Sequence, residues 1–378
     1  MSITRPNLSN WMKPPNQRWS FRHVRELLPT ERIRAPRQSL SLGSDPRPAV
    51  LDLVVQGLNG STSVREALST GESDALVVIH DGDVVAEWLG DGVADDEPHL
   101  VFSVTKSITG LLAAALAGAG LLDLEANLVD YLPEAEGSGF GTATLRHLLD
   151  MEASYAFVED YSPGPDVTAY RHSVGWYPAP EGAPALREFL LTRQQEGEHG
   201  QVFRYLSPTC DLMGMVCARA AGTTWAQAVS TYLWQPMGAE ADADVTVDRE
   251  GSPRAAGGFS AVPRDIARLG MLVARKGAGV IPEAFIDDII HGGDPEHWAN
   301  GDFATFLPGG AYRSYWYQPR VDDDVVCGVG IYGQMLYVDV PRQVVVVIQS
   351  SWSEPDNQLR ELANLDICRT IARSFDAE

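Results

Sequence analysis

The sequence predicts an α+β fold: an antiparallel sheet flanked by helices, with strands from both ends of the chain, and an inserted all-α domain. Segments rich in Val and Ile and separated by short turns lie near both ends, at 75–90 and at 327–352, as is typical of strands. From 124 to about 234, most apolar residues follow a helical spacing instead. Strands near both ends with helices between them indicate one sheet domain interrupted by a helical domain.

The length of the chain also favours two domains. Its 378 residues, 44% of them hydrophobic, exceed the size at which a single core usually stops growing. We expect residues 1–98 and 236–378 to form the α/β domain and residues 99–235 to form the mainly α-helical domain. The functional site is expected between them.

The elements of the first third can be predicted in chain order. The segment before Pro48 is rich in Pro and Arg, and we expect an arm wrapped over a domain. The pair Asp81-Gly82 suits a tight turn between the two apolar segments of 75–90, which predicts a hairpin. In residues 103–121, Leu and Ala replace Val and Ile, which predicts a helix.

The C-terminal elements follow from the same reasoning. Two runs of β-branched residues flank the pair Pro341-Arg342, which predicts two strands joined by a turn. The apolar spacing from 359 to 372 then predicts a final helix.

Charge excludes two classes of partner. A formal net charge of −22 repels phosphate backbones and anionic membrane surfaces, because a protein binds either partner through a basic patch.

The N-terminal residues contain no apolar run of secretory length, so we expect a cytoplasmic protein. The apolar stretch 100–122 contains Lys106 and three glycines, which suits a buried helix better than a membrane span. A small-molecule substrate is the expected partner, and the sequence is compatible with a homodimer.

Cysteines and histidines indicate neither disulfides nor a metal. The four cysteines form no CxxC pair and are expected to be reduced core thiols; they are Cys210, Cys217, Cys327 and Cys368. The eight histidines form no HExxH motif and no Cys/His quartet, so we expect no metal and no cofactor.

The first chemical signal is Ser103-Val-Thr-Lys106, an SxxK tetrad at the start of the apolar helix. Residues at i and i+3 share a helical face, so the hydroxyl and the amine can come within hydrogen-bond reach. The positive end of the helix dipole would stabilise an alkoxide at Ser103. The alternative interpretation is an N-cap serine followed by a solvated lysine. Lys106 has almost only apolar or small neighbours, which favours a lowered pKa and a role as a base.

The second signal is Tyr205-Leu-Ser207, about a hundred residues later and before an apolar helix. With this motif the chain resembles the serine β-lactamases, penicillin-binding peptidases and related esterases, whose second motif is Tyr-x-Asn or Tyr-x-Ser. The resemblance implies a serine β-lactamase-like fold and a proton carried by Tyr205 between Ser103 and the leaving group. A tyrosine at this place can also be an ordinary packed ring, and that alternative stays open.

The third motif of that family, a Lys-Thr-Gly strand, has no literal match. The glycine-rich segment 328–334 fills its place and would let backbone amides approach a substrate. We expect an oxyanion hole formed by the amides of Ser103 and Ile331, with Tyr332 as the alternative to Ile331. An ordinary strand with bulge glycines is the other interpretation.

A second resemblance covers nearly the whole chain. The strings NWMKPPNQRWSFRHV, EDYSPGP, HSVGW, STYLW, GGFSAVPRDIARLG and SSWSEPD are similar to those of the 6-aminohexanoate-dimer hydrolases, or nylon-oligomer hydrolases. This resemblance implies cleavage of a linear amide without a metal. It implies that Tyr161 assists the leaving amine and that Tyr317, beside Trp316, walls the substrate. Some relatives carry Asn where this chain has Ala256, which bears on substrate fit more than on the reaction class.

Three functions remain open at this level. The first is an amidase acting on short linear amides, and the second is a carboxylesterase using the same residues, since neutral esters need no carboxylate anchor. The third is a binding or sensing module that keeps the fold without turnover. A Ser-His-Asp hydrolase is disfavoured because the chain has no GxSxG elbow.

Overall fold

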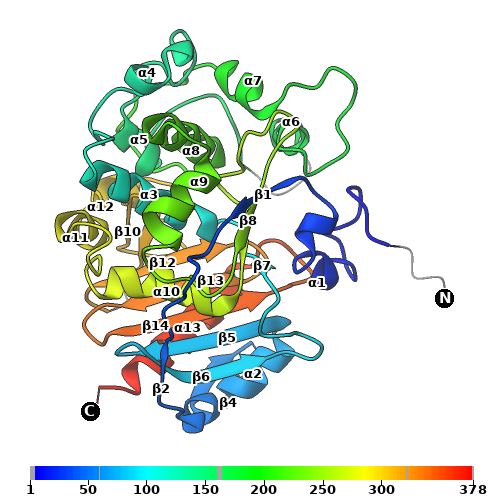
Figure 1. The fold of residues 1–378 in the computed structure, drawn as a ribbon, viewed down its shortest axis with the longest axis vertical. Coiled ribbons are helices and arrows are strands. Elements are labelled where there is room, and N and C mark those ends of the chain that lie inside the picture. Colours follow the sequence, from blue (N-terminus) through cyan, green and yellow to red (C-terminus); the bar gives the residue numbers. More distant parts are fainter. Residues whose placement is uncertain (1–4, 59, 160–163, 321, 377–378) are drawn as a thin grey trace.

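The computed structural model describes residues 5–58, 60–159, 164–320 and 322–376. Its main sheet has eight strands in the order β10-β11-β12-β13-β14-β5-β6-β2 (Figure 1). Neighbouring strands are antiparallel except β2 and β6, which are parallel. In sheet order, the strands are Ala311–Arg313, Trp316–Gln318, Val325–Gly330, Gln334–Asp339, Val344–Ser350, Ser73–His80, Asp83–Leu89 and Gly43–Ser44. The sheet therefore joins strands from both ends of the chain, as the sequence predicts.

The hairpin of β5 and β6 forms where the sequence predicts it. His80 pairs with Asp83, so the turn consists of Asp81 and Gly82, both with positive φ. Two residues with positive φ match the twist of the flanking strands. The C-terminal strands β13 and β14 are likewise joined by a short turn that contains Pro341-Arg342.

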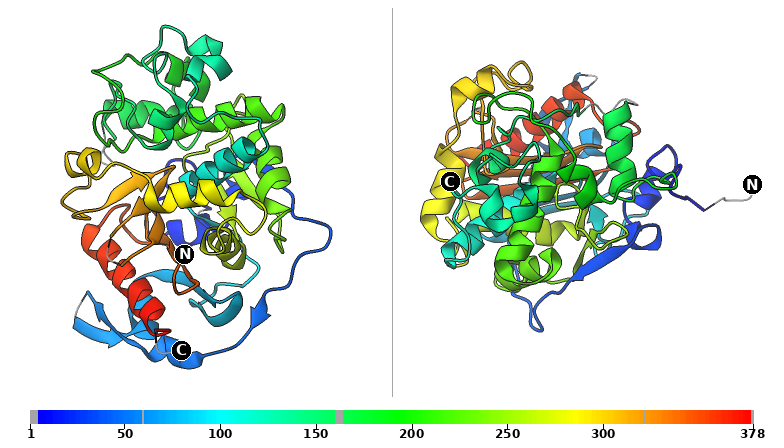
Figure 2. Two further views of the ribbon diagram at one scale, coloured as in Figure 1. Left: turned by 90° about the vertical axis from the view of Figure 1, so that its left-hand side faces the viewer. Right: turned by 90° about the horizontal axis from the view of Figure 1, so that it is seen from above.

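Helices cover both faces of the main sheet (Figures 1 and 2). Helix α10 contacts β5, β13 and β14 on one face, and α13 contacts β13 and β14 on the other. The expected C-terminal helix is α13. The α-helices of the two chain ends are α1, α2, α10, α11, α12 and α13, at Gln17–Ser20, Val64–Thr70, Pro263–Ala274, Glu283–His291, Pro295–Ala299 and Gln358–Arg373.

Residues between 104 and 234 form the helical part, drawn at the top of Figure 1. Its α-helices, α3 to α9, are Val104–Gly118, Leu128–Tyr131, Leu145–Leu149, Pro165–Ser173, Leu186–Leu191, Ser207–Ala221 and Trp225–Val229, and a π-helical turn follows at Ser230–Trp234. Helix α3 is buried over 104–116, with α8 on one side and strands β11, β12 and β13 on another. Its first turn consequently lies where the helices meet the sheet. The domain boundaries at 98/99 and 235/236 stay a prediction.

A smaller sheet connects the N-terminal arm to this junction. Its strand order is β1-β8-β9-β7, at Thr30–Ile33, Ala243–Thr246, Phe259–Ala261 and His99–Leu100. The arm also buries Trp11 and Phe21 completely. A further hairpin of β3 and β4, Val54–Gly57 and Gly60–Ser63, contacts α13. The arm therefore contributes a strand and core residues as well as wrapping over the surface.

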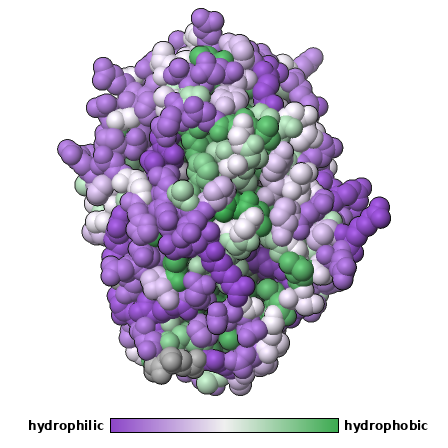
Figure 3. All heavy atoms as spheres, turned by 60° about the vertical axis from the view of Figure 1, so that its left-hand side comes forward, coloured by the Kyte–Doolittle hydropathy of each residue, from purple (hydrophilic) through white to green (hydrophobic). Residues whose placement is uncertain are grey.

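The interior and the surface agree with the composition. All four cysteines are free and buried, as expected for core thiols. The face in Figure 3 is mostly hydrophilic, with a strip of apolar residues near its middle. Among the described residues, no helix combines the length and the apolar character needed to cross a membrane.

Candidate active site

Ser103 lies at the turn from β7 into α3. The preceding residue, Phe102, adopts φ +44°, a left-handed conformation that is costly for a bulky side chain. Its ring is held by edge contacts with Phe21 and Trp176 and by a tilted contact with Tyr332, at centroid separations of 4.8, 5.9 and 5.1 Å. This packing fixes the turn and presents Ser103 at the N-terminal end of α3, where it is the N-cap residue.

Lys106 lies one helical turn later and faces Ser103. Its Nζ is 2.8 Å from Ser103 Oγ and donates to the carbonyl oxygen of Ala256 at 2.9 Å. The side chain is buried, and this burial lowers the pKa of Lys106 to about 8. An appreciable fraction of the amine is therefore neutral near neutral pH, as a base for Ser103 requires.

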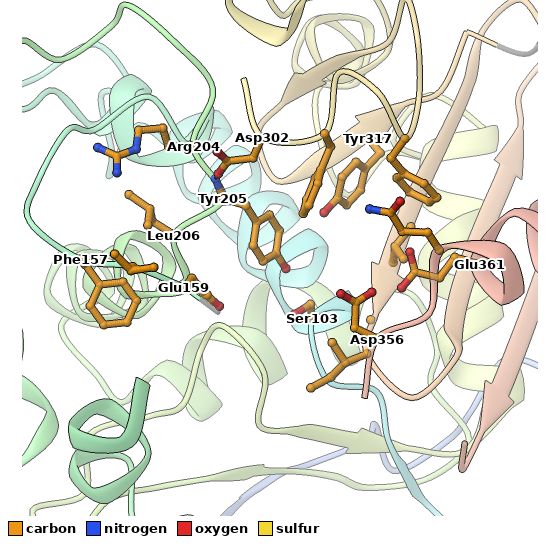
Figure 4. Close-up of a pocket in the computed structure, with 17 residues that line it drawn as sticks. Ser103, Phe157, Glu159, Arg204, Tyr205, Leu206, Asp302, Tyr317, Asp356 and Glu361 are labelled. Atoms are coloured by element: carbon orange, nitrogen blue, oxygen red, sulfur yellow. The ribbon is translucent and has the colours of Figure 1, made fainter. Parts of the chain in front are cut away.

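Tyr205 reaches the same point from the segment before α8. Its backbone amide donates to Asp302 Oδ2 at 2.8 Å, and its ring centroid lies 4.8 Å from Lys106 Nζ. Its hydroxyl points toward Ser103 (Figure 4) and has hydrogen-bonding contact with the side chains of Ser103 and Tyr317. Burial, followed by the charge of Glu159, holds the pKa of Tyr205 well above its usual range. The tyrosine therefore stays protonated and can donate.

Gly330 lets the end of β12 approach Ser103 closely. A Cβ built on Gly330 would lie 2.7 Å from the carbonyl oxygen of Val101 and 3.1 Å from the amide nitrogen of Ser103. Only glycine allows this approach, which brings the following residue, Ile331, against Ser103. Within the described part of the chain, neither Ser103 nor Ile331 donates its amide to a backbone acceptor. The amide of the alternative residue, Tyr332, is occupied by the carbonyl oxygen of Pro355 at 2.8 Å.

Ser103 borders two cavities. The larger, an open cavity of about 300 Å³, is the one in Figure 4 and includes Tyr205 and Tyr317 among its lining residues. The smaller, of about 50 Å³, is lined mainly by apolar and aromatic residues, including Phe102 and Trp176, together with two arginines. Ser103, Glu159 and Ile331 line both cavities. Ser103 therefore lies where the two cavities meet.

Glu159 is a site residue that the sequence analysis missed. Its carboxylate accepts from the backbone amide and the hydroxyl of Ser207, both at 2.5 Å. The serine of the Tyr-Leu-Ser motif therefore anchors Glu159 rather than pointing at Ser103. The negative charge of Glu159 opposes the lowering of the pKa of Lys106. No short motif marks Glu159, because its partner lies 48 positions further along the chain.

A buried ion pair, which the sequence analysis also missed, holds the backbone segment that contacts Lys106. Arg254 Nη1 donates to Asp211 Oδ2 and to the hydroxyl of Tyr170, both at 2.6 Å. The other oxygen of Asp211 accepts the amide of Ala256 at 2.9 Å. Because the carbonyl of Ala256 accepts from Lys106, this network fixes the acceptor that orients the amine. The sequence signal that could have indicated this ion pair is Asp211, a charged residue within the apolar pattern of α8.

The remaining expected residues have different outcomes. Tyr317, on β11, is buried and lines the larger cavity, whereas Trp316 beside it is fully buried in the core. Trp176 lines the smaller cavity and donates through Nε1 to Thr246 Oγ1 at 3.1 Å. Tyr161 lies outside the described residues. The structure brings Ser103, Lys106 and Tyr205 together, and their roles stay a prediction.

Comparisons with known proteins agree with the two resemblances. A family model described as beta-lactamase matches residues 66–368. The chain is 32% identical to the 6-aminohexanoate-dimer hydrolase of Paenarthrobacter ureafaciens, over 98% of this chain and 95% of that protein. The solved structure of a candidate 6-aminohexanoate-dimer hydrolase from Bacillus anthracis has a TM-score of 0.88 at 26% identity, and covers 100% of this chain and 98% of its own. EstCE1, a hydrolase with promiscuous acyltransferase activity, shares the fold with a TM-score of 0.63 at 16% identity, over 82% of this chain and 96% of its own.

Proposed function

The chain belongs to the beta-lactamase family and is a serine hydrolase, and from the geometry of its site we propose that it cleaves short linear amides through an acyl-enzyme on Ser103. The family and the β-lactamase-like fold are those that the sequence predicts. One observation carries the proposal: the Ser103 hydroxyl lies 2.8 Å from a buried amine whose pKa is lowered to about 8.

The first step is attack by Ser103. Neutral Lys106 accepts the Ser103 proton, and Oγ forms a bond to the carbonyl carbon of the substrate. The oxyanion that results is stabilised by the amides of Ser103 and Ile331. Pre-organised donors of this kind lower a barrier by roughly 3–4 kcal/mol each.

The second step expels the amine. Tyr205, which stays protonated because burial raises its pKa, donates its proton to the leaving nitrogen and recovers one from Lys106. The C–N bond breaks and leaves an ester on Ser103. Water then attacks this ester with the same residues as bases, so that the acid is released and Ser103 regains its proton.

The preference for amides rests on the relative with 32% identity, which is named for hydrolysis of the 6-aminohexanoate dimer, a linear amide. Its similarity extends over nearly the whole chain. Tyr317 is proposed to wall the substrate, and Tyr161 is proposed to assist the leaving amine.

A carboxylesterase is the second candidate. The third family motif lacks its lysine in this chain, so no motif cation is available to anchor a substrate carboxylate, and neutral esters need none. The solved structure of a family VIII carboxylesterase has the same fold, with a TM-score of 0.60. A sensor without turnover is the least favoured candidate, because Ser103, Lys106 and Tyr205 are all present and in contact.

The test compares an amide and an ester of the same acyl group with purified protein and with Ser103→Ala. Turnover of the amide by the wild type alone supports the proposal. Turnover of the ester only would favour the carboxylesterase. An acyl adduct on Ser103 that forms without product release would favour the sensor, and equal turnover by Ser103→Ala would refute the nucleophile.

A further inference from the structure

The segment that carries Tyr205 lies between α7 and α8 and has no regular secondary structure. The position of the Tyr205 ring therefore depends on the contacts that other segments make with this backbone. The amide of Phe203 donates to the carbonyl oxygen of His297 at 3.2 Å. The amide of Arg204 donates to the carbonyl oxygen of Met151 at 2.8 Å. Two different segments thus hold the residues that lead to the tyrosine.

The Tyr-Leu-Ser motif itself is held by acidic side chains. Tyr205 donates its backbone amide to the carboxylate of Asp302 at 2.8 Å. Ser207 donates its backbone amide to the carboxylate of Glu159 at 2.5 Å. A hydrogen bond to a charged acceptor is stronger than one to a carbonyl oxygen. The motif is consequently fixed at both ends by carboxylates from distant segments.

Asp302 belongs to the turn after α12 and contacts the backbone of Tyr205 rather than its hydroxyl. Its carboxylate lies at the backbone end of Tyr205, whereas the hydroxyl points toward Ser103 (Figure 4). The ring of the next residue, Phe303, has its centroid 5.4 Å from that of Tyr205. The turn therefore supports the tyrosine at its backbone and along its ring.

A glycine brings this turn close enough for these contacts. A Cβ built on Gly301 would lie 2.4 Å from the carbonyl oxygen of Phe203, a separation that a real Cβ atom does not adopt. The amide of Asp302 is 3.4 Å from the same oxygen. The missing side chain at Gly301 thus lets the turn pack against the segment of Tyr205.

The two carboxylates differ in their effect on the proton-transfer residues. After burial, the strongest influence on the pKa of Lys106 and of Tyr205 is the charge of Glu159, which favours a higher value in both. Asp302 is instead an exposed residue, and solvent screens the charge of an exposed acid. A substitution at Asp302 therefore changes the position of Tyr205, whereas one at Glu159 also changes the local charge.

On these contacts, and resting on the proposed acyl-enzyme mechanism, we propose that Asp302 is a positioning residue that holds Tyr205 within reach of the leaving group. The Tyr205 hydroxyl gives its proton to the leaving atom as the bond to the acyl carbon breaks, and it recovers a proton from Lys106. The electron pair of that bond stays on the leaving atom. Amines and alkoxides need this proton, whereas p-nitrophenolate leaves without one. Asp302 is consequently required for amides and alkyl esters more than for activated esters.

The test compares three derivatives of hexanoic acid: the butyl amide, the butyl ester and the p-nitrophenyl ester. The measured quantity is kcat/KM, which reports the acylation step and not the later hydrolysis of the acyl-enzyme. In Asp302→Ala it should fall about tenfold for the first two substrates and less than about twofold for the third. Asp302→Asn keeps an oxygen that can accept the amide of Tyr205, and it should restore most of the activity. Equal losses on all three substrates, or no loss, would overturn the proposal.

A double variant determines whether Asp302 acts through Tyr205. Tyr205→Phe has no proton to donate, so the addition of Asp302→Ala to it should lower kcat/KM for the amide no further. Losses that multiply in the double variant would mean that Asp302 acts by another route, and would contradict the proposal.

Two further variants separate this role from general stability. Gly301→Ala, which pushes the turn away from Phe203, should reproduce the selective loss, and it decides the question if Asp302→Ala does not fold. Asp294→Ala is the matched control, because Asp294 also accepts backbone amides but does so at the start of α12. This control should lower thermal stability and leave the ratio of the amide to the p-nitrophenyl ester unchanged. A control with the same selective loss as Asp302→Ala would refute a specific role for Asp302.

The same measurements distinguish this inference from the proposed function. If the wild type cleaves both esters but not the amide, the preference for amides is wrong, and the two esters still test Asp302. If Ser103→Ala hydrolyses all three substrates as fast as the wild type, the acyl-enzyme mechanism is wrong, and the role of Asp302 is wrong with it.

Discussion

Two clusters in this molecule combine a serine hydroxyl with titratable side chains, and they differ in what they face. Ser103 is partly exposed, borders both cavities and is in contact with Lys106 and Tyr205. Ser351, in contrast, lies fully inside the protein with His99 and Asp74. The second cluster contains the residue types of a Ser-His-Asp triad but not their arrangement. The sequence likewise disfavours a hydrolase of that type.

The hydrogen bonds of the second cluster show why. Ser351 Oγ donates to Asp74 Oδ2, whereas a nucleophilic serine must give its proton to the histidine. His99 Nε2 is 3.2 Å from the same carboxylate, and Arg18 Nε donates to its other oxygen at 3.2 Å. Three partners thus converge on one buried carboxylate and join the N-terminal arm, β7 and the segment after β14.

The two clusters differ in whether burial decides the pKa of the charged group. Burial alone would raise the pKa of Asp74, but hydrogen bonds from His99 and Ser351 and the charge of Arg18 bring it below its ordinary value. At Lys106 burial prevails, and the pKa falls to about 8. A compensated charge stabilises the fold, and an uncompensated charge is available for chemistry.

The largest expected contrast between the clusters is in the nucleophile. Ser103→Ala should lower kcat/KM by about 10⁴-fold or more, because no other group can form the acyl intermediate. Ser351→Ala should keep activity within about twofold, because Ser351 does not reach the cavity. Steady-state assays of both variants, with circular dichroism as the check on folding, measure this contrast. Comparable losses in the two variants would break the distinction.

The next effect concerns proton transfer. Lys106→Ala and Tyr205→Phe should each reduce kcat by about 10²-fold or more, the usual contribution of a positioned acid or base. The loss in Tyr205→Phe should be larger for an amide than for an activated ester, since only the amine needs a proton to leave. A Tyr205→Phe variant with equal losses on both substrates would show that Tyr205 acts elsewhere.

In the buried cluster, the largest effect is expected on stability. Asp74→Asn removes the charge on which His99 and Arg18 converge, and should lower the free energy of unfolding by about 3 kcal/mol. Because the folded pKa of Asp74 is depressed, its contribution is present above the unfolded value of 3.8 and is lost as pH falls through the folded pKa. Denaturation of wild type and variant at pH 7 and in acid checks both statements. A variant as stable as the wild type at pH 7 would contradict a structural role.

Much of the chemistry of the first cluster could be predicted from sequence, because its key pair is local. Ser103 and Lys106 lie three residues apart on one helix, and the turn that precedes them is short. Tyr205 required a resemblance, since nothing in its own neighbourhood distinguishes it from a packed ring. The sheet joining both chain ends was predictable from β-branched runs at each end.

What escaped prediction depends on long-range contacts. Glu159 meets Ser207 across 48 positions, and Asp74 meets Ser351 across 277. Neither pair has a periodic or local signature, and each acquires its role only when distant segments pack together.

The pH dependence of catalysis should follow Lys106. Since the neutral amine is the base, log kcat/KM should rise with a slope of about one per pH unit below the pKa of about 8 and level off above it. The raised pKa of Tyr205 predicts no second decline before strongly alkaline pH. A profile that falls between pH 7 and 9 would mean that protonated Lys106 is the active form.

The smallest expected effect is on the free energy of unfolding, and its sign at Lys106 is opposite to its sign at Asp74. The pKa of Lys106 is 10.5 unfolded and about 8 folded, so the unfolded chain binds more protons between these values and stability rises with pH there. Below pH 8 the buried amine is consequently destabilising, and Lys106→Met, which keeps the length of the side chain without its charge, should stabilise the protein at pH 7. The gain is about 1–2 kcal/mol, because the full shift is partly offset by the hydrogen bond lost at Ala256. Denaturation at pH 7 and at pH 10 measures it, and the gain should shrink at the higher pH. If Lys106→Met were instead destabilised as strongly as Asp74→Asn, the lysine would be a structural ion like the aspartate, and the difference between the two clusters would disappear.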